Sequence, residues 1–270
     1  MKIVHLNTTI NNSSAPYKLH LEMKKQGFES KILTFMADVE NSEDVVIVKG
    51  SLPYKIKRRI YAKKRSDLSN SFELQEKMPI DILPVGMDLS KHPLVKAADA
   101  VFIHWTNGDF FSYEHLHKLT ELNIKIYQFC HDNYTFTGGC HVRMGCEGYK
   151  SKCSNCPQIK GKKAKGYLNN IIEEKKTAFS KGDITIVSPS TWMDRNVSSS
   201  YVLDGLKHMV LPNVIDTEVF KPYEDTEKYR KELGLAADDF VILCAIKADE
   251  SIPYNGMKYL WSALAEINKR

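Results

Sequence analysis

The stretch KIVHLNTTINNSSAPYKLHLEMKKQGFESKILTF, residues 2–35, decides the fold class of this chain. It begins with the apolar run KIVHL, which is typical of a buried strand, and a polar loop at residues 7–16 follows. Apolar residues then recur at helical spacing from Tyr17 to Gln26, and Gly27 is a natural end for that helix. FESKILTF comes next as a second strand, and a strand, a helix and a strand in this order predict a parallel β-sheet.

The same alternation of strands and helices continues along the chain, whereas residues 40–83 show no readable pattern. Further strands are predicted at AVFIHW (100–105), IKIYQFC (124–130), ITIVSPS (184–190) and HMVLPN (208–213). The sequence therefore predicts an α/β fold, with a doubly wound, Rossmann-like parallel sheet over residues 1–212.

A second domain is predicted after a proline-containing linker at residues 213–222. Residues 223–270 hold a charged helix, the strand DFVILCAI (239–246) and a final helix. A single strand and its helix are too little to bury a sheet of their own. We therefore expect residues 223–270 to be the incomplete start of a second Rossmann-like domain, in a truncated chain.

Composition places the chain among ordinary globular proteins: of its 270 residues, 43% are hydrophobic and 26% are charged. No apolar run reaches the roughly 18 residues that a membrane-spanning helix needs. The start MKIVHLNTT lacks the apolar stretch and cleavage site of a signal peptide. We therefore expect a cytoplasmic protein.

The formal net charge of +5 is mild, so a basic surface has to be local, and the densest cluster is YKIKRRIYAKKR at residues 54–65. As a helix, this segment places Ile56, Ile60 and Tyr61 on one face and basic residues on the rest. Such a helix can lie on anionic lipid headgroups, which predicts peripheral contact at the inner face of the plasma membrane. A solvated connecting helix is the alternative. No nucleic-acid-reading motif surrounds the segment, so nucleic acid is not an expected partner.

Polar side chains follow three of the predicted strands at the point where each strand ends. Each could by itself be a helix cap or a hydrogen-bonded structural residue. Because the carboxyl ends of parallel strands meet at one edge of a sheet, where ligands bind, we expect these side chains to form a binding site. The candidates are Asn7, Thr8, Ser13 and Ser14 after the first strand, His104 and Asn107 after another, and His131, Asp132 and Asn133 after a third.

A cysteine-rich loop at residues 138–157, GGCHVRMGCEGYKSKCSNCP, holds four of the six cysteines. Four thiolates from one loop can surround a tetrahedral Zn²⁺, and glycines allow the turns that such wrapping needs. We therefore expect a structural zinc site made of Cys140, Cys146, Cys153 and Cys156. Disulfide bonds, free thiols and an iron–sulfur cluster use the same residues and stay open as alternatives.

Five segments in this order carry a family resemblance: residues 92–110, residues 131–142 with the HD motif, the cysteine-rich loop, IVSPSTWM (186–193) and LPNVIDTEVFKP (211–222). Together they resemble bacterial family-4 glycosyltransferases of the GT-B fold. The similarity is greatest to colanic-acid and exopolysaccharide-type members that carry a four-cysteine insert.

The resemblance implies a retaining glycosyltransferase, which moves a sugar from a nucleotide-sugar donor to a glycan or lipid-linked acceptor in cell-surface polysaccharide synthesis. It implies catalytic roles for His131 and Asp132, with His131 in contact with the transferred sugar. It places residues 7–14 beside the donor phosphates, where many such enzymes use no metal, and it matches Lys247 to a phosphate-binding basic residue.

The sequence departs from the family at residues 254–256, Tyr-Asn-Gly, where Arg-Lys-Gly is expected. Since a charge-assisted phosphate contact is lost there, we expect the 270-residue chain to be inactive alone. Two alternatives stay open: a non-catalytic, zinc-stabilised module that binds a glycan or a partner protein, and a nucleotide-sugar epimerase.

Overall fold

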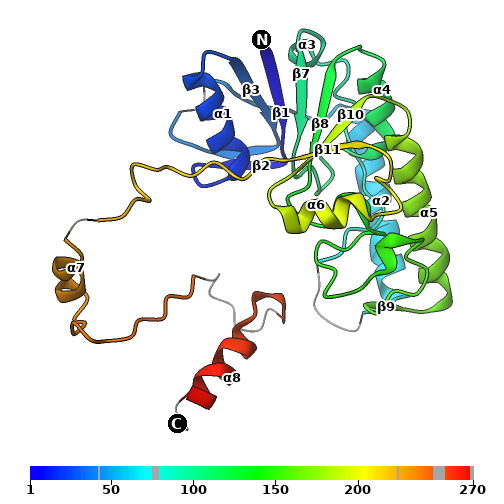
Figure 1. The fold of residues 1–270 in the computed structure, drawn as a ribbon. Coiled ribbons are helices and arrows are strands. Elements are labelled where there is room, and N and C mark those ends of the chain that lie inside the picture. Colours follow the sequence, from blue (N-terminus) through cyan, green and yellow to red (C-terminus); the bar gives the residue numbers. More distant parts are fainter. Residues whose placement is uncertain (42, 75–78, 224, 246–252, 268–270) are drawn as a thin grey trace. The chain divides into compact units, whose positions relative to one another are not determined.

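The computed structural model describes residues 1–41, 43–74, 79–223, 225–245 and 253–267 (Figure 1). The chain divides into two compact units, residues 1–214 and residues 215–270. Lys247, a predicted donor-binding residue, lies outside the described residues.

The first unit is built on a seven-stranded parallel sheet in the order β11-β10-β8-β7-β1-β3-β5. The chain adds strands on one side of β1 and then on the other, so the order reverses between β1 and β7, as in a doubly wound sheet. This confirms the predicted fold class. The strands are β1 (Lys2–Leu6), β3 (Glu29–Thr34), β5 (Val45–Ile47), β7 (Ala100–Ile103), β8 (Lys125–Phe129), β10 (Ile184–Ser188) and β11 (Lys207–Val210).

Helices cover both faces of this sheet, and its strands β1, β7 and β10 are buried along nearly their whole length. On one face, Leu19 and Met23 of α1 pack on Ile3, Phe102 and Phe129. On the other face, a larger core takes in side chains from the remaining helices. The helices of the first unit are α1 (Ala15–Lys25), α2 (Leu52–Asn70), α3 (Pro93–Lys96), α4 (Leu116–Thr120), α5 (Lys162–Phe179) and α6 (Thr191–Ser198).

Short elements complete the loops at the strand ends. A three-residue parallel pair joins β2 (Thr9–Asn11) to β4 (Met36–Asp38), and an antiparallel pair joins β6 (Glu73–Leu74) to β9 (Ile159–Lys160). Single turns of 3₁₀ helix lie at η1 (Tyr113–His115), η2 (Tyr134–Phe136) and η3 (Gly148–Lys150). Helix α1 ends as predicted at Gly27, whose φ of +82° is a conformation that glycine adopts without strain.

Two long helices go beyond what the sequence predicted: α2 extends past the helix considered at residues 54–65, and α5 was not predicted. The unreadable stretch 40–83 contains α2, and the segment after the cysteine-rich loop forms α5. Helix α5 carries Lys175, which is 2% exposed and whose amine donates to the carbonyls of Tyr134 and Thr137. Burial lowers the pKa of Lys175 to about 7. This helix therefore supports the loop that follows β8.

In the second unit the predicted helices are present as α7 (Thr226–Glu232) and α8 (Met257–Ile267), with a 3₁₀ turn η4 (Pro253–Asn255) between them. The predicted strand at 239–246 is wrong for its described part, because residues 239–245 form no strand. A strand is defined by its hydrogen bonds to a neighbour. No other strand lies among the described residues of this unit, so these residues have nothing to pair with.

Candidate functional site at the strand ends

The loops after β1 and β7 meet at the carboxyl edge of the sheet. The amide of Thr8 donates to the carbonyl of Trp105 at 2.9 Å, and Asn7 Oδ1 accepts from the amide of Trp105 at 2.9 Å. Thr8 Oγ1 also donates to the carbonyl of Asn107. The predicted residues Asn7, Thr8 and Asn107 are thus brought together, but all three are buried and hold the loops to each other.

The histidines that follow β7 and β8 are in direct contact. His104 is buried, His131 is half-buried, and His104 Nδ1 lies 3.0 Å from His131 Nε2. His131 lines two small cavities of about 10 Å³ each, one beside Asp132 and one beside Leu211. Burial lowers the pKa of both histidines. His131 therefore presents a neutral imidazole at the strand ends.

Ser13 and Ser14 lie apart from this group, at the start of α1. Both hydroxyls bond to Asn11, at 2.9 Å for Ser13 and 2.7 Å for Ser14. Pro16 has no amide hydrogen, and the amides of Tyr17 and Lys18 donate to the carbonyl of Ser14. The first turn of α1 therefore offers fewer free donors to an anion than a glycine-rich loop would.

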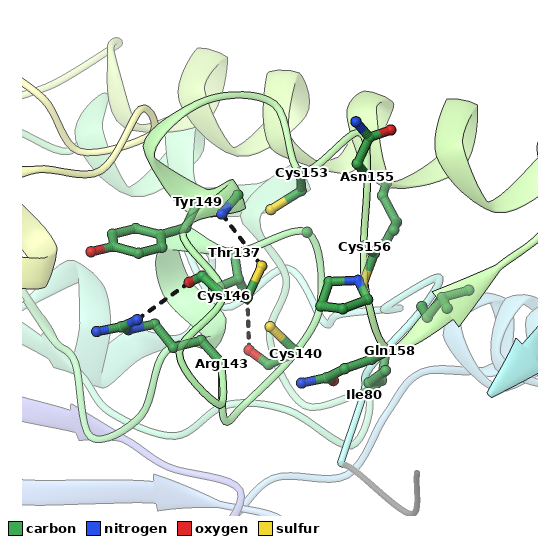
Figure 2. A pocket seen from close by; sticks show the side chains of 15 residues that line it. Ile80, Thr137, Cys140, Arg143, Cys146, Tyr149, Cys153, Asn155, Cys156 and Gln158 are labelled. Atoms are coloured by element: carbon green, nitrogen blue, oxygen red, sulfur yellow. Dashed lines mark hydrogen bonds between the residues drawn. The ribbon is translucent and has the colours of Figure 1, made fainter. Parts of the chain in front are cut away.

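The cysteine-rich loop packs beside the segment that follows β8. Its four cysteines carry no disulfide and line one cavity of about 30 Å³, into which their side chains project (Figure 2). The loop turns sharply at Met144, Gly145 and Cys153, which have φ of +46°, +82° and +49°. The amide of Gly148 donates to Cys146 Sγ at 3.3 Å. The four predicted metal ligands thus share one cavity.

Three of these thiols, those of Cys140, Cys153 and Cys156, are held in the protonated form. Burial, together with neighbouring Cys153 and Cys156, raises the pKa of Cys140 to about 11, and burial also raises the pKa values of Cys153 and Cys156. Among the described residues, no three His, Cys, Asp or Glu side chains stand in a metal-binding arrangement. A bound cation would require the sulfurs to close in and lose their protons.

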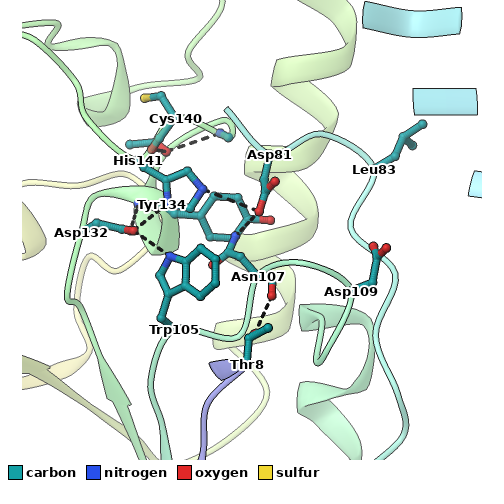
Figure 3. A network of polar contacts seen from close by, with 12 residues as sticks. Thr8, Asp81, Leu83, Trp105, Asn107, Asp109, Asp132, Tyr134, Cys140 and His141 are labelled. Atoms are coloured by element: carbon teal, nitrogen blue, oxygen red, sulfur yellow. Dashed lines mark hydrogen bonds and ion pairs between the residues drawn. The ribbon is translucent and has the colours of Figure 1, made fainter. Parts of the chain in front are cut away.

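His141, next to the first of these cysteines, returns to the strand ends and bridges two carboxylates (Figure 3). Its Nδ1 lies 2.6 Å from Asp132 Oδ2, and its Nε2 lies 3.6 Å from Asp81 Oδ2. Trp105 Nε1 donates to Asp132 at 3.1 Å, and Asn107 Nδ2 donates to Asp81 at 2.7 Å. The predicted catalytic Asp132 is therefore part of a larger network.

One positive charge lies between the carboxylates of this network. Burial lowers the pKa of His141, but its bonds to Asp132 and Asp81 outweigh burial and raise that pKa to about 9. Burial raises the pKa of Asp81, but the bonds from His141 and Asn107 hold it below its usual value. His141 is thus an imidazolium between carboxylates at neutral pH. Sequence reasoning missed Asp81, because it lies at the end of the unreadable stretch 40–83.

The side chain of Asn133 is bonded within the molecule. Its Oδ1 accepts from the amide of Arg143 at 3.2 Å, and its Nδ2 lies 3.6 Å from Met193 Sδ. The side chain is buried and ties the cysteine-rich loop to α6. The contact of Asn133 with substrate stays a prediction.

The basic segment 54–65 lies within α2, so it is helical as predicted, but several of its charges are used inside the molecule. Arg58 and Arg65 both contact the carboxylate of Asp109, at 3.1 Å and 2.6 Å. Lys57 pairs with Glu114 at 2.7 Å. The apolar residues Leu52, Ile56 and Ile60 lie exposed along the helix.

A groove of about 660 Å³ lies between α2, η1 and α5, and the sequence did not predict it. Tyrosines and charged residues line it, among them Tyr61, Tyr113, Tyr167 and Lys181. Tyr113 also lines one of the small cavities at His131, so the groove and the strand-end site share a wall.

No protein-family model and no curated protein matches this chain. In structure it is similar to a UGT transferase from Siraitia grosvenorii in complex with UDP, with 9% sequence identity and a TM-score of 0.34. The match covers 85% of this chain and 52% of the transferase chain. The chain therefore spans about half the length of that transferase.

Proposed function

We propose that this chain is the acceptor-side part of a retaining glycosyltransferase, which moves a sugar from a nucleotide-sugar to a glycan or lipid-linked acceptor. The supporting observation is the neutral, half-buried His131, which lines two cavities at the carboxyl edge of a doubly wound sheet. Ligands of such sheets bind at this edge. The HD motif and the four segments around it support the same class of reaction.

In this reaction the bond between the anomeric carbon and the diphosphate breaks, and its electron pair leaves with the diphosphate. The acceptor oxygen bonds to that carbon on the same face, and its proton passes to the departing phosphate. A neutral His131 can hydrogen-bond a sugar hydroxyl, but it cannot neutralise a diphosphate. That task needs a basic group such as Lys247, the residue predicted to bind the donor phosphates.

The experiment uses the whole protein, a panel of nucleotide-sugars and a lipid-linked glycan extract, and it measures nucleotide release. His131→Ala should reduce release by at least about tenfold, since a lost transition-state hydrogen bond costs more than 1.4 kcal/mol. His92→Asn is the matched control. His92 caps α3 at the opposite edge of the sheet, and asparagine keeps the cap.

Unchanged release in folded His131→Ala would exclude His131 from the site. Absence of release with every donor would favour the alternative, a non-catalytic module that binds a glycan or a partner. An epimerised nucleotide-sugar in place of free nucleotide would favour the epimerase.

We also propose that Cys140, Cys146, Cys153 and Cys156 bind one structural zinc ion, since all four line one cavity. Elemental analysis of the purified chain should find about one zinc per chain. Cys146→Ser should lose the metal and lower the melting temperature, whereas the exposed Cys244→Ser should change neither. A metal-free wild type that keeps the same melting temperature in chelator would contradict the proposal.

We propose further that α2 lies against anionic lipid at the cytoplasmic face of the membrane. The exposed Leu52, Ile56 and Ile60 provide an apolar row for this contact. No described helix is both long and apolar enough to span a bilayer. The wild type should sediment with phosphatidylglycerol vesicles, whereas the double variant Ile56→Asp, Ile60→Asp should stay in the supernatant. Equal sedimentation of both proteins with the vesicles would contradict the membrane proposal.

A further inference from the structure

A continuous row of hydrogen bonds links His131 to three other histidines and a serine. His131 Nε2 lies 3.0 Å from His104 Nδ1, and His104 Nε2 lies 2.9 Å from His5 Nδ1. His5 Nε2 lies 3.1 Å from Ser30 Oγ, which in turn lies 2.7 Å from His20 Nδ1. We call these five residues the histidine chain. All except His131 are buried.

The order of the strands produces this row. Strands β8, β7, β1 and β3 are neighbours, and they or the loops that follow them carry His131, His104, His5 and Ser30 in that order. His5 pairs in register with Phe102, two residues before His104, so both histidines project from the same face. Helix α1 packs on this face and supplies His20.

The rings meet edge to edge. The planes of His5 and His104 differ by 9°, and those of His104 and His131 by 25°, with ring centroids 5.2 Å apart in both pairs. Nitrogen–nitrogen distances of 2.9 and 3.0 Å are much shorter than the centroid distances, so the nitrogens lie between the rings. Each contact is therefore a directional N–H···N hydrogen bond.

These rings are neutral at physiological pH. Burial lowers the pKa of His5 to about 3 and that of His20 to about 4, and it lowers the pKa values of His104 and His131 as well. A neutral imidazole has one donor nitrogen and one acceptor nitrogen. If one of the rings of His5, His104 and His131 reverses its tautomer, the other two have to reverse too, because each contact between them needs one donor and one acceptor. These three rings therefore have only two fully bonded states.

The distances around Ser30 distinguish the two states. The 2.7 Å contact with His20 Nδ1 is a usual length for a hydroxyl donor, whereas 3.1 Å to His5 Nε2 is long for a hydroxyl and usual for an N–H donor. In this state Ser30 donates to His20 and accepts from His5. His5, His104 and His131 then all carry their proton on Nε2, the nitrogen that free neutral histidine also prefers.

We propose that the histidine chain locks His131 as the Nε2–H tautomer, so that its Nδ1 presents a lone pair to the ligand. No described residue forms a hydrogen bond with this Nδ1. The ligand group must then be a donor, such as a hydroxyl, and not a carbonyl or an ether oxygen. On the proposed function, which this step assumes, the donor is a hydroxyl of the transferred sugar. Ser30, His5 and His104 are positioning residues.

The experiment is a long-range ¹H–¹⁵N correlation spectrum of the whole chain with ¹⁵N-labelled histidine, at mildly alkaline pH and without ligand. His131 is assigned by its loss in His131→Gln. In the wild type, its Nδ1 should show the shift of an unprotonated nitrogen and its Nε2 that of a protonated one. Ser30→Ala removes the acceptor of His5, and the two His131 shifts should then move toward each other as both tautomers become populated.

Ser188→Ala is the matched control. Ser188 is a fully buried serine at the end of β10 whose hydroxyl has no partner among the described residues, so its removal should leave the His131 shifts unchanged. If Ser30→Ala fails to fold, His20→Leu tests the same point from the helix side, because it frees the Ser30 hydroxyl to donate to His5.

A protonated Nδ1 on His131 in the wild type would overturn the inference. So would His131 shifts that stay at their wild-type values in folded Ser30→Ala or His20→Leu. The measurement needs no enzymatic turnover. Unchanged nucleotide release in folded His131→Ala would refute the role of His131 in the proposed function and leave the tautomer result standing.

Discussion

Two buried histidines beside the same site, His104 and His141, are held in opposite charge states. His104 is 3% exposed and contacts only other neutral rings, so burial lowers its pKa well below the usual value. His141 is 9% exposed and contacts Asp132 and Asp81, so its pKa rises to about 9 in spite of burial. The partner, and not the depth of burial, decides the charge.

The difference also separates two roles. The neutral histidine chain can transmit a hydrogen-bond direction to His131 but can provide no charge. The charged His141 joins the loops that contain Asp81 and Asp132, and it provides the positive charge between them. Four substitutions or conditions test this comparison, from the largest expected effect to the smallest.

The largest effect should come from His141→Leu, because this variant leaves two neighbouring carboxylates without their cation. We expect the free energy of unfolding to fall by about 2–4 kcal/mol, which is less than for a fully buried ion pair, because the side chains of Asp132 and Asp81 are 25% and 38% exposed. Urea unfolding of the whole chain measures it. The same substitution in an Asp81→Asn background should cost less, and an equal cost in both backgrounds would show that the loss is one of packing.

Acid should destabilise the chain through the neutral histidines. The pKa values of His5 and His20 in the fold, about 3 and about 4, lie below those of the unfolded chain. The unfolded state therefore takes up protons first as pH falls below about 6.5. The share of the stability that these neutral histidines provide should be greatest above that pH, and it should fall by about 1 kcal/mol per buried histidine between pH 7 and about 5.5.

Unfolding curves over that range measure this loss. His5→Gln should make the dependence on pH shallower by one proton. A dependence equal to that of the wild type would mean that His5 is protonated in the fold.

Asp109→Asn tests another carboxylate, which is buried although its two arginine partners reach solvent. Asp109 is 8% exposed and binds Arg58 and Arg65, which are partly exposed. Asparagine readily adopts the φ of +72° that Asp109 has, so the substitution should leave the backbone conformation unchanged. We expect a loss of about 1–3 kcal/mol, as for hydrogen bonds to charged groups. A loss as large as that of His141→Leu would mean that solvent does not relieve the unpaired arginines.

The smallest effect should come from His208→Gln. His208 Nδ1 lies 2.9 Å from Asp194 Oδ1, which is a histidine–carboxylate contact like that of His141, but 39% of the histidine side chain is exposed. Water screens such a pair, so we expect a change below about 1 kcal/mol. A larger loss would show that the contribution of a histidine–carboxylate contact to the free energy of unfolding depends on the contact itself and not on its burial.

Much of the sheet could be predicted from the sequence, because strands buried on both faces leave runs such as KIVHL and ITIV that stand out between polar loops. The polar residues after those runs marked the strand-end edge. Helix α5 was not predicted, since it has mixed polar and apolar residues and no side-chain cap, which gives a weak pattern. Of α2, only residues 54–65 were considered as a helix, although Ser51 caps its start. For the strand predicted at 239–246, no strand lies among the described residues of the second unit to pair with residues 239–245.

By itself, the sequence determined the α/β class, the strand ends and the cysteine-rich loop, because these depend on residues close together in the chain. Only the tertiary structure decided which histidine is charged and which is neutral. His5, His104 and His131 align because β1, β7 and β8 are neighbours in the sheet. His141 meets Asp81 only because two loops close on each other. The pKa of a side chain depends on its neighbours in space, and the local sequence does not contain them.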